Sequence, residues 1–260
     1  MQLTVEQIRD FHLNGFLAIT EPITTAGEIA QVRDIYDDIF SRRAGRESGD
    51  QFDLAGTDEE GKQAALPQIL NPSKYAPQLD EGQFLKTAQS IVKQLLGPEA
   101  GLGIGHAIFK PAGVGAATPW HQDEAYWDPT LDYVSVSVWM PLQEATIENG
   151  CLWFMPGSNR WPVVPHQSIG GDVRIHGLEI VDTSVLKDPV ACPLPPGGVT
   201  IHLNKTAHYA GPNQSGIPRR ALIMMGGLAA RPYPVQRSFP WNEVKETARE
   251  ERAKAVAGKA

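Results

Sequence analysis

The feature that most constrains the fold of this chain is a change of sequence pattern near Gly101. Before this residue, apolar side chains recur every three or four positions, which is the spacing of amphipathic helices. After it, short runs rich in β-branched and aromatic residues alternate with Gly, Pro, Asn and Asp, a pattern typical of strands joined by turns. Helices followed by a series of short strands favour a β-sandwich or jelly roll supported by helices. We therefore expect an α+β fold that is mainly β.

Helices are predicted only in the first hundred residues and near the C-terminal end. Two of them begin at motifs with the form of a capping box, Thr4-Val5-Glu6-Gln7 and Thr25-Ala26-Gly27-Glu28. The first is expected to end at Gly15, because glycine readily adopts the left-handed conformation that closes a helix. A further helix spans residues 83–96 and is followed by Gly97-Pro98.

Strands are predicted from the runs of β-branched and aromatic residues at 16–19, 104–110, 121–123, 133–141, 151–155, 199–203 and 220–226. Residues 133–139 alternate strictly, so that three valines share one face of the strand and Ser135, Ser137 and Trp139 share the other. Small polar residues that end in a tryptophan indicate the wall of a cavity.

We expect one domain over residues 1–260, with mainly helical support in 1–100, the jelly-roll core in 101–230 and a C-terminal tail in 231–260. The Gly-rich, charged stretch 42–62 predicts a loop or lid. The long connection 159–196 predicts a lid that shapes specificity. The charged residues after Trp241 indicate a solvated helix rather than a functional element.

Composition excludes several classes of partner. The formal net charge is −7 and no cluster of basic residues occurs, so we expect no nucleic acid partner. The two cysteines, Cys151 and Cys192, lie in apolar or Pro-rich settings, as in a reduced intracellular protein. The N-terminus does not resemble a signal peptide and no apolar run is long enough to cross a membrane. We expect a cytoplasmic protein with no membrane contact.

The segment around Trp120-His121-Gln122-Asp123 predicts a metal site. Residues two apart on an extended strand point to the same face, so the His121 imidazole and the Asp123 carboxylate can bind one ion. Two protein ligands are too few, and a third must come from elsewhere in the chain. Among the other histidines, His208 is favoured because it follows a strand and precedes Gly211-Pro212-Asn213. His202 is the alternative third ligand.

Two histidines and one carboxylate on one face of a metal are the ligand set of non-haem Fe(II) oxygenases, and they leave three positions for chemistry. The electrons for O2 activation can come from a 2-oxo acid that chelates the iron, and its far carboxylate then needs a cation. Arginine suits that task because its planar fork matches a carboxylate. Arg219 and Arg220 stand at the start of an apolar strand, where alternation turns only one of them inward.

Three motifs occur in order along the chain: His121-x-Asp123, the block 148–158 (ENGCLWFMPGS), and His208-x-x-Gly211-x-Asn213-x-Ser215 followed by Arg219. Together they resemble the phytanoyl-CoA dioxygenase family of Fe(II)- and 2-oxoglutarate-dependent oxygenases. The resemblance extends from about residue 15 to about residue 226. It implies a double-stranded β-helix core of the jelly-roll or cupin-like kind.

The resemblance implies roles for individual residues. The iron ligands would be His121, Asp123 and His208, and Arg219 rather than Arg220 would bind 2-oxoglutarate. The further positions that the family places beside the co-substrate are Trp139, Gln68 and His106.

Three other positions refine this expectation. Many relatives carry a hydroxyl residue two positions after the distal histidine, where this chain has Ala210, so one co-substrate hydrogen bond is missing or comes from elsewhere. Related halogenases have a small residue in place of the carboxylate, and Asp123 therefore favours hydroxylation or another oxidation. Tyr126 and Trp127 follow the ligands and are interpreted either as walls of the substrate pocket or as core residues.

We therefore expect an Fe(II)- and 2-oxoglutarate-dependent dioxygenase that uses O2 to oxidise a small organic metabolite and releases succinate and CO2. The alternatives are a metal-dependent jelly-roll enzyme that does not use 2-oxoglutarate and a non-catalytic small-molecule-binding relative. In the first of these, Arg219 would point outward or pair with a protein carboxylate. The identity of the substrate and the oligomeric state stay open.

Overall fold

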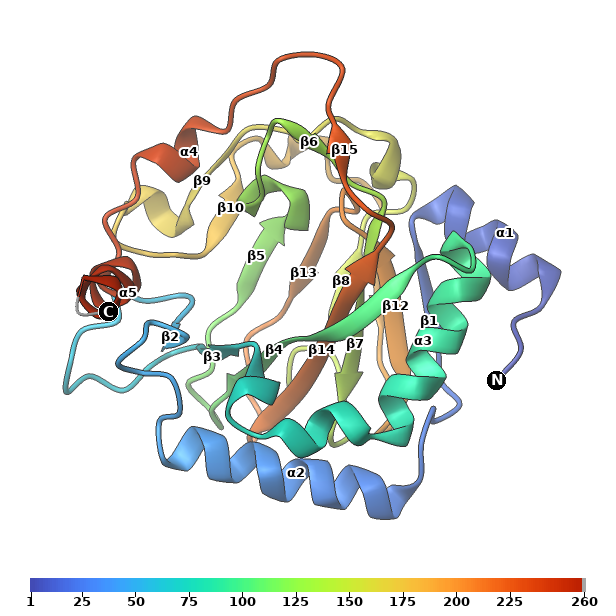
Figure 1. The fold of residues 1–260 in the computed structure, drawn as a ribbon, viewed down its shortest axis with the longest axis horizontal. Coiled ribbons are helices and arrows are strands. Elements are labelled where there is room, and N and C mark those ends of the chain that lie inside the picture. The colour runs from blue at the N-terminus through green and yellow to red at the C-terminus, as the bar shows by residue number, and fades with distance from the viewer. Residues whose placement is uncertain (259–260) are drawn as a thin grey trace.

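A computed structural model describes residues 1–258 of the chain (Figure 1). The strands are β1 (Phe16–Ile19), β2 (Gln51–Asp53), β3 (Pro67–Leu70), β4 (Gly101–Lys110), β5 (Thr118–His121), β6 (Leu131–Asp132), β7 (Ser135–Pro141), β8 (Leu152–Phe154), β9 (His166–Ser168), β10 (Leu178–Ile180), β11 (Val190–Cys192), β12 (Val199–Leu203), β13 (His208–Ala210), β14 (Arg219–Gly227) and β15 (Arg231–Pro232). The helices are α1 (Val5–Asn14), α2 (Ala26–Ser41), α3 (Gln83–Leu96), α4 (Pro240–Glu243) and α5 (Ala248–Ala257).

Two antiparallel sheets form the centre of the molecule. The larger has the strand order β1-β12-β7-β14-β4-β3-β2 and the smaller β11-β8-β13-β5. From β4 to β14 the chain passes repeatedly between them, with β4, β7, β12 and β14 in the larger sheet and β5, β8, β11 and β13 in the smaller. Residues far apart in the sequence therefore become neighbours. His121 on β5 pairs directly with His208 on β13.

The capping box predicted for the first helix is confirmed, and the one predicted for the second helix forms only in part. Thr4 and Gln7 form the full capping box of α1, and Gly15 ends that helix in the left-handed conformation. At the start of α2 the Thr25 hydroxyl accepts the bond from Glu28 N. The Glu28 carboxylate, however, accepts bonds from the first backbone N–H groups of α3. The N-cap of α3 is Gly82, which has no side chain to perform this role.

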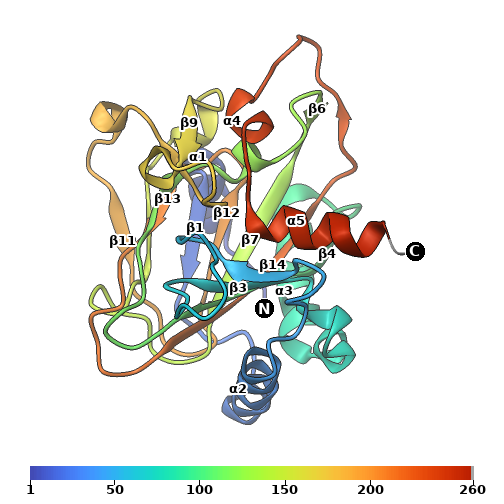
Figure 2. The ribbon, with the colours of Figure 1, turned by 90° about the vertical axis from the view of Figure 1, so that its left-hand side faces the viewer.

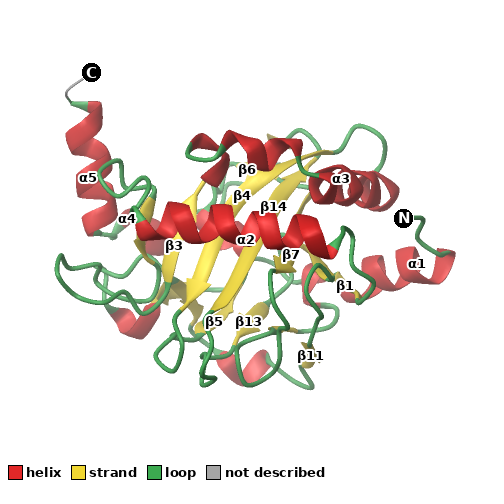
Figure 3. Ribbon diagram, turned by 90° about the horizontal axis from the view of Figure 1, so that it is seen from below, coloured by secondary structure: helices red, strands yellow, loops and turns green. Residues whose placement is uncertain are grey.

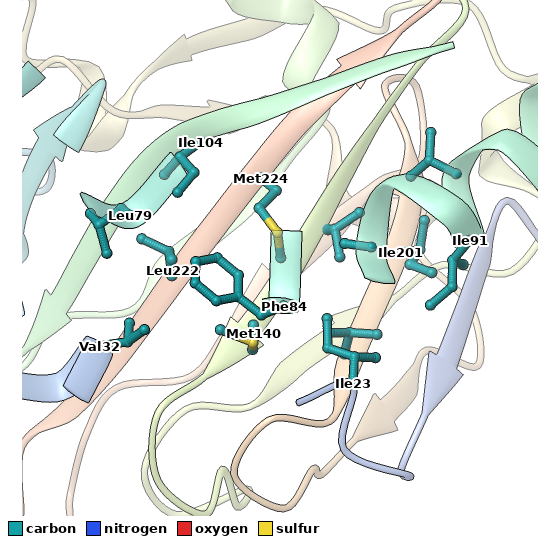
Figure 4. Packing of buried hydrophobic residues seen from close by; sticks show 14 of the residues in the cluster. Ile23, Val32, Leu79, Phe84, Ile91, Ile104, Met140, Ile201, Leu222 and Met224 are labelled. Atoms are coloured by element: carbon teal, nitrogen blue, oxygen red, sulfur yellow. The ribbon is translucent and has the colours of Figure 1, made fainter. Parts of the chain in front are cut away.

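The main apolar core lies between the larger sheet and the helices α2 and α3, which lie across its outer face (Figure 3). Val32, Phe84 and Ile91 from the helices meet Met140, Leu222 and Met224 from the strands (Figure 4). Val136 and Val138 face this core, whereas Ser137 and Trp139 face the cavity between the sheets. The predicted alternation of this strand is confirmed. Truncating the fully buried Phe84 to alanine would cost about 3–5 kcal/mol.

Several predicted boundaries were wrong. The stretch 42–62 is mostly turns, but it contains β2, which pairs with β3 and extends the larger sheet. The strand predicted at 121–123 ends at His121, and Asp123 begins a 3-10 turn that ends at Tyr126. Gln122 between them stays extended (φ −115°, ψ 132°), which is why His121 and Asp123 still face the same side. The strand predicted at 133–141 begins two residues later, at Ser135.

The C-terminal segment is bound to the rest of the molecule by residues that precede its last helix. The solvated helix predicted after Trp241 is confirmed as α5, which has no buried residue. The Arg237 guanidinium donates to the buried Glu124 carboxylate at 2.7 Å, and the Trp241 indole donates to Ala125 O at 2.8 Å. Helix α5 lies at the β3–β2 end of the larger sheet (Figure 2), where Arg252 donates to Gln51 O of β2 and pairs with Asp58 of the 42–62 stretch. Within residues 1–258, no helix is both long and apolar enough to span a membrane.

Candidate metal centre

A cavity of about 440 Å³ opens between the two sheets. Every site residue predicted from the sequence lines it: Gln68, His106, His121, Asp123, Tyr126, Trp127, Trp139, His208 and Arg219. The strands of both sheets and the C-terminal segment contribute to its walls.

The structure brings His121, Asp123 and His208 together. One potential ligand atom of each lies within 4.8 Å of the other two. The Nε2 atoms of His121 and His208 lie 3.7 and 3.5 Å from Asp123 Oδ1. The three residues are held by the β5–β13 pairing and by the turn that begins at Asp123.

Both imidazoles are oriented for metal binding. His121 Nδ1 lies 2.8 Å from Pro119 O, and His208 Nδ1 lies 2.9 Å from Thr206 O. A carbonyl oxygen only accepts, so Nδ1 carries the proton in each ring and Nε2 presents its lone pair to the centre. Two lone pairs that face one carboxylate oxygen repel each other unless a cation lies between them. The donor set therefore fits a bound metal ion.

Protonation states agree with this arrangement. Burial lowers the pKa of His121 and of His208, so both rings are neutral at physiological pH. Burial by itself raises the pKa of Asp123, whereas positive charge on the surrounding imidazoles, His208 first, or a cation held between them lowers it below its ordinary value. An ionised carboxylate and two neutral imidazoles are the forms that bind a divalent metal.

Two residues that the sequence interpretation did not place in this role contact the second carboxylate oxygen of Asp123. The Ser137 hydroxyl donates to Oδ2 at 2.6 Å, and His202 Nε2 lies 3.3 Å from it. His202, the alternative third ligand, thus faces Oδ2. The three potential ligand atoms that lie close together belong to His121, Asp123 and His208. These contacts depend on the register of β12 against β7, which pairs His202 with Ser137. The sequence of a single strand does not reveal its register against a neighbour.

Arg219 points into the cavity. Its side chain is buried, its guanidinium lies 5.4 Å from the centre of the Trp139 ring, and burial lowers its pKa to about 10. Its Nε and Nη1 atoms are buried without a hydrogen-bond partner among residues 1–258. A buried cation in this state is costly unless an anion pairs with it. Arg220, the alternative, points outward and pairs with Asp37.

Gln68 and His106 lie beside each other on β3 and β4, with Gln68 Nε2 3.3 Å from His106 Nδ1. Ala210, which departs from the family pattern, lies on β13 directly opposite Thr118 of β5, and both residues line the cavity. The sequence interpretation did not include Thr118. Its hydroxyl lies across the strand pair from the position where relatives carry theirs.

Tyr126 and Trp127 form part of the cavity wall. The Tyr126 ring lies edge-on to His121, with 6.0 Å between ring centres, and its hydroxyl accepts a bond from Leu178 N at 2.7 Å. Trp127 packs against Tyr133 and is half-buried. Both are walls of the cavity rather than core residues.

The outer rim contains residues that the sequence did not indicate as functional. His176 from the 159–196 connection and Lys245 and Arg249 from the C-terminal segment all line the cavity. No periodicity or motif in the sequence connects these residues. The C-terminal segment, which distant ion pairs hold in place, brings two of them into the site: Lys245 just before α5 and Arg249 on α5.

A facial set of two histidines and one carboxylate, beside a buried arginine that lacks an anion, defines the non-haem iron oxygenases that use a 2-oxo acid. Comparisons with known proteins agree. The sequence model of the phytanoyl-CoA dioxygenase family (PhyH) matches residues 11–221. The chain therefore belongs to the phytanoyl-CoA dioxygenase family and is an iron- and 2-oxoglutarate-dependent dioxygenase.

Individual relatives span most of the chain. A probable alpha-ketoglutarate-dependent hypophosphite dioxygenase of Stutzerimonas stutzeri is 27% identical over 234 residues, covering 88% of this chain and 80% of that protein. Phytanoyl-CoA dioxygenase 1 of Oryza sativa subsp. japonica is 26% identical over 252 residues, covering 85% of this chain and 88% of that protein.

A solved structure is also similar over nearly the whole chain. The crystal structure of EvdO2 from Micromonospora carbonacea var. aurantiaca matches with a TM-score of 0.79 at 39% identity, covering 93% of this chain and 97% of EvdO2. A second structure of EvdO2, complexed with 2-oxoglutarate, matches with a TM-score of 0.78 at 34% identity, with the same coverage of both chains.

Proposed function

We propose that this protein hydroxylates, or otherwise oxidises, a small organic molecule, with His121, Asp123 and His208 as its iron ligands and Arg219 as its 2-oxoglutarate anchor. The observation that carries this proposal is the buried guanidinium of Arg219, which lacks an anion and lines the same cavity as the ligand triad. When bound, the iron and the co-substrate supply the oxygen activation, and 2-oxoglutarate leaves as succinate and CO2.

The protein's own part is to hold and orient these groups. The carbonyls of Pro119 and Thr206 fix the two imidazoles. The Ser137 hydroxyl holds Asp123 Oδ2 by a hydrogen bond and His202 Nε2 lies beside that oxygen, which leaves Oδ1 for the metal. Such outer contacts tune the affinity for the metal and the orientation of its ligands. Because the Asp123 carboxylate occupies a ligand position, we propose oxidation rather than halogenation as the outcome.

Around the co-substrate, we assign Trp139 as the aromatic neighbour and Gln68 and His106 as polar contacts. Thr118 supplies the hydroxyl that Ala210 lacks. This assignment rests on the direct pairing of Ala210 with Thr118 and on the place of both residues in the cavity wall. A planar arginine and one hydroxyl together match the geometry of a carboxylate.

The two sheets, in this proposal, form a double-stranded β-helix. The alternation of β4, β7, β12 and β14 with β5, β8, β11 and β13 supports this topology, as does the antiparallel pairing within each sheet. Two sheets built this way face each other and leave a mouth between them. The proposed metal ligands, His121 on β5, Asp123 directly after it and His208 on β13, line that space.

The substrate is expected to be small. The 440 Å³ cavity must also hold the co-substrate, so the part of the substrate that lies inside the cavity is small. The relative described as a probable hypophosphite dioxygenase supports a small substrate as well. Tyr126 and Trp127 are assigned to the substrate side because they line the cavity next to the ligand strand. The net charge of −7 makes nucleic acid an unsuitable partner.

The inward orientation of Arg219, which meets no protein carboxylate within 4.0 Å among the described residues, argues against an enzyme that uses no 2-oxo acid. The test is succinate formation by the purified protein with Fe(II), 2-oxoglutarate and O2, with and without a panel of small acids and alcohols. We expect slow succinate formation without substrate and an increase with the true substrate. A protein that binds Fe(II) but never consumes 2-oxoglutarate would contradict the proposal.

A further inference from the structure

We propose that Lys245, Arg249 and His176 form an anion-binding subsite at the rim of the cavity, called here the rim subsite, which holds an acidic group of the substrate. The inference rests on the proposed oxygenase function and names its substrate class: a small organic acid with a carboxylate or phosphoryl group. Lys245 and Arg249 are specificity-determining residues in this proposal.

The Lys245 ammonium has N–H groups that remain available for a ligand. Its Nζ atom donates to His176 O at 3.0 Å and lies 4.9 Å from the centre of the Tyr126 ring. It has no carboxylate partner within 4.0 Å among residues 1–258. An ammonium has three N–H groups, so two remain available in the cavity that Lys245 lines. Burial lowers the pKa of Lys245 to about 8, an effect that the charge of Glu250 offsets only in part.

Arg249 is in a similar state. Its guanidinium lies 5.0 Å from the centre of the Phe52 ring, and its Nε atom is buried without a hydrogen-bond partner in the described part of the chain. Arg252, one turn further along α5, pairs with Asp58, so the helix is held in place without Arg249. The guanidinium fork of Arg249 is thus free to bind an oxyanion from outside the chain.

His176, whose carbonyl oxygen accepts the bond from Lys245, completes the rim subsite. Its ring stacks on Tyr126 with 5.8 Å between centres and meets Phe52 edge-on at 4.9 Å. Its Nδ1 atom is buried and has no hydrogen-bond partner among residues 1–258. Burial lowers the pKa of His176, so the ring is neutral. A neutral imidazole provides a hydrogen bond to the substrate without adding charge.

The rim subsite is separate from the arginine that serves the co-substrate. The groups around Arg219 include Trp139, Tyr36, Cys151 and the buried Lys110, whereas the charged neighbours of Lys245 are Glu250 and Arg249. On the rim, Glu250 is a carboxylate that faces the two cations, and Asp50 already pairs with Lys74. Two cations against one carboxylate leave a surplus of positive charge, which favours an anionic ligand.

The test uses the iron-loaded, 2-oxoglutarate-loaded enzyme without O2 and measures the Kd of three probes by calorimetric titration: propionate, methylphosphonate and neutral propionamide. The variants are K245Q, R249Q and the double variant, with K254Q as the matched control because Lys254 lies on α5 and is exposed. We expect one acid probe or both to bind more tightly than propionamide. We expect each single variant to lose about 10-fold in affinity for the acid and the control to lose none.

Each alternative has its own outcome. If the acids bind equally well to wild type and double variant, they bind the metal or another surface, and the rim subsite is wrong. If the variants unfold at lower temperature but keep the preference for acids, Lys245 and Arg249 are structural only. The Kd of 2-oxoglutarate is measured alongside: failure of wild type to bind it overturns the oxygenase proposal, whereas normal 2-oxoglutarate binding with no acid preference overturns the rim subsite alone. The variant R249K keeps the positive charge, and an affinity for the acid probes between those of wild type and R249Q would support a role of charge.

Discussion

The deep end of the cavity and its rim are built in different ways. At the deep end, His121, His208 and Arg219 stand on strands of the two sheets, and backbone pairing such as that of His121 with His208 fixes their positions. Asp123 follows on the turn directly after β5. At the rim, Lys245 and Arg249 belong to a segment held by side-chain contacts, among them those of Arg237 with Glu124 and of Arg252 with Asp58.

This difference separates two tasks. Iron and 2-oxoglutarate are the same in every turnover, and strand positions hold their ligands with little freedom. The substrate differs among relatives, and a rim built from the 159–196 connection and the C-terminal segment can change without disturbing the sheets. We therefore expect that a substitution at one end of the cavity leaves ligand binding at the other end intact.

The largest effect is expected from His208→Ala. Removal of one of three ligands should lower the affinity for Fe(II) by more than about 100-fold and abolish 2-oxoglutarate turnover. Metal content after dialysis and succinate formation measure both quantities. His12→Ala is the control, because His12 is exposed on α1. Normal iron binding by His208→Ala would remove His208 from the ligand set and point to His202.

Arg237→Met should have the next largest effect, and it acts on the rim. It leaves the Glu124 carboxylate, which is 1% exposed, without its ion-pair partner, and should lower the free energy of unfolding by about 3 kcal/mol. Urea unfolding measures the loss. Arg220→Met removes a more exposed pair with Asp37 and should cost less than about 1 kcal/mol. Equal losses in the two variants would mean that Arg237 does not hold the C-terminal segment.

Arg219→Lys tests the other part of the deep end. The change keeps the charge but removes the planar fork, so we expect the Kd of 2-oxoglutarate to rise about 10-fold to 100-fold while iron binding is unchanged. Arg220→Lys is the matched control, since its neighbour is the protein carboxylate of Asp37. An unchanged Kd for 2-oxoglutarate in Arg219→Lys would refute the assignment of this anchor.

Thr118→Val tests the replacement for the hydroxyl that Ala210 lacks. Loss of one hydrogen bond should raise the Kd of 2-oxoglutarate by about 3-fold to 10-fold. Because Ala210 lies directly opposite Thr118, the double variant Thr118→Val, Ala210→Ser should recover most of the affinity. If it recovers none, the two positions do not serve the same carboxylate.

The smallest effect concerns pH. Lys245 has a pKa of about 8 in the folded protein, with Arg249 and Glu250 as its charged neighbours. It is therefore cationic below that pH, and its charge disappears as the pH rises through about 8. The affinity for an acidic probe should decline over this range by at most about 10-fold in wild type and stay flat in Lys245→Gln. Titrations at several pH values give the profile, and an identical decline in both proteins would assign it to another group.

The sequence predicted the deep end well and the rim poorly, for physical reasons. Helix caps and strand alternation are local properties, so α1, β12 and the inward face of Trp139 were predicted correctly. The pair of His121 with Asp123 also follows from local backbone geometry.

Other features depend on pairing between distant segments. The contacts of Ser137 and His202 with Asp123 require the register of β7 against β12. The short β2 lies in a stretch with no periodic pattern and exists because β3 pairs with it. The positions of Lys245 and Arg249 depend on ion pairs made elsewhere on the same segment. Such tertiary contacts leave no local signal in one sequence.

The most direct test of the central claim is an anaerobic titration of the Fe(II)-loaded protein with 2-oxoglutarate, followed by visible absorption. A 2-oxo acid that chelates Fe(II) gives a charge-transfer band. We predict that the band appears in wild type, requires a higher 2-oxoglutarate concentration in Arg219→Lys and is absent in His208→Ala. Iron bound at full occupancy with no band at saturating 2-oxoglutarate would contradict the account.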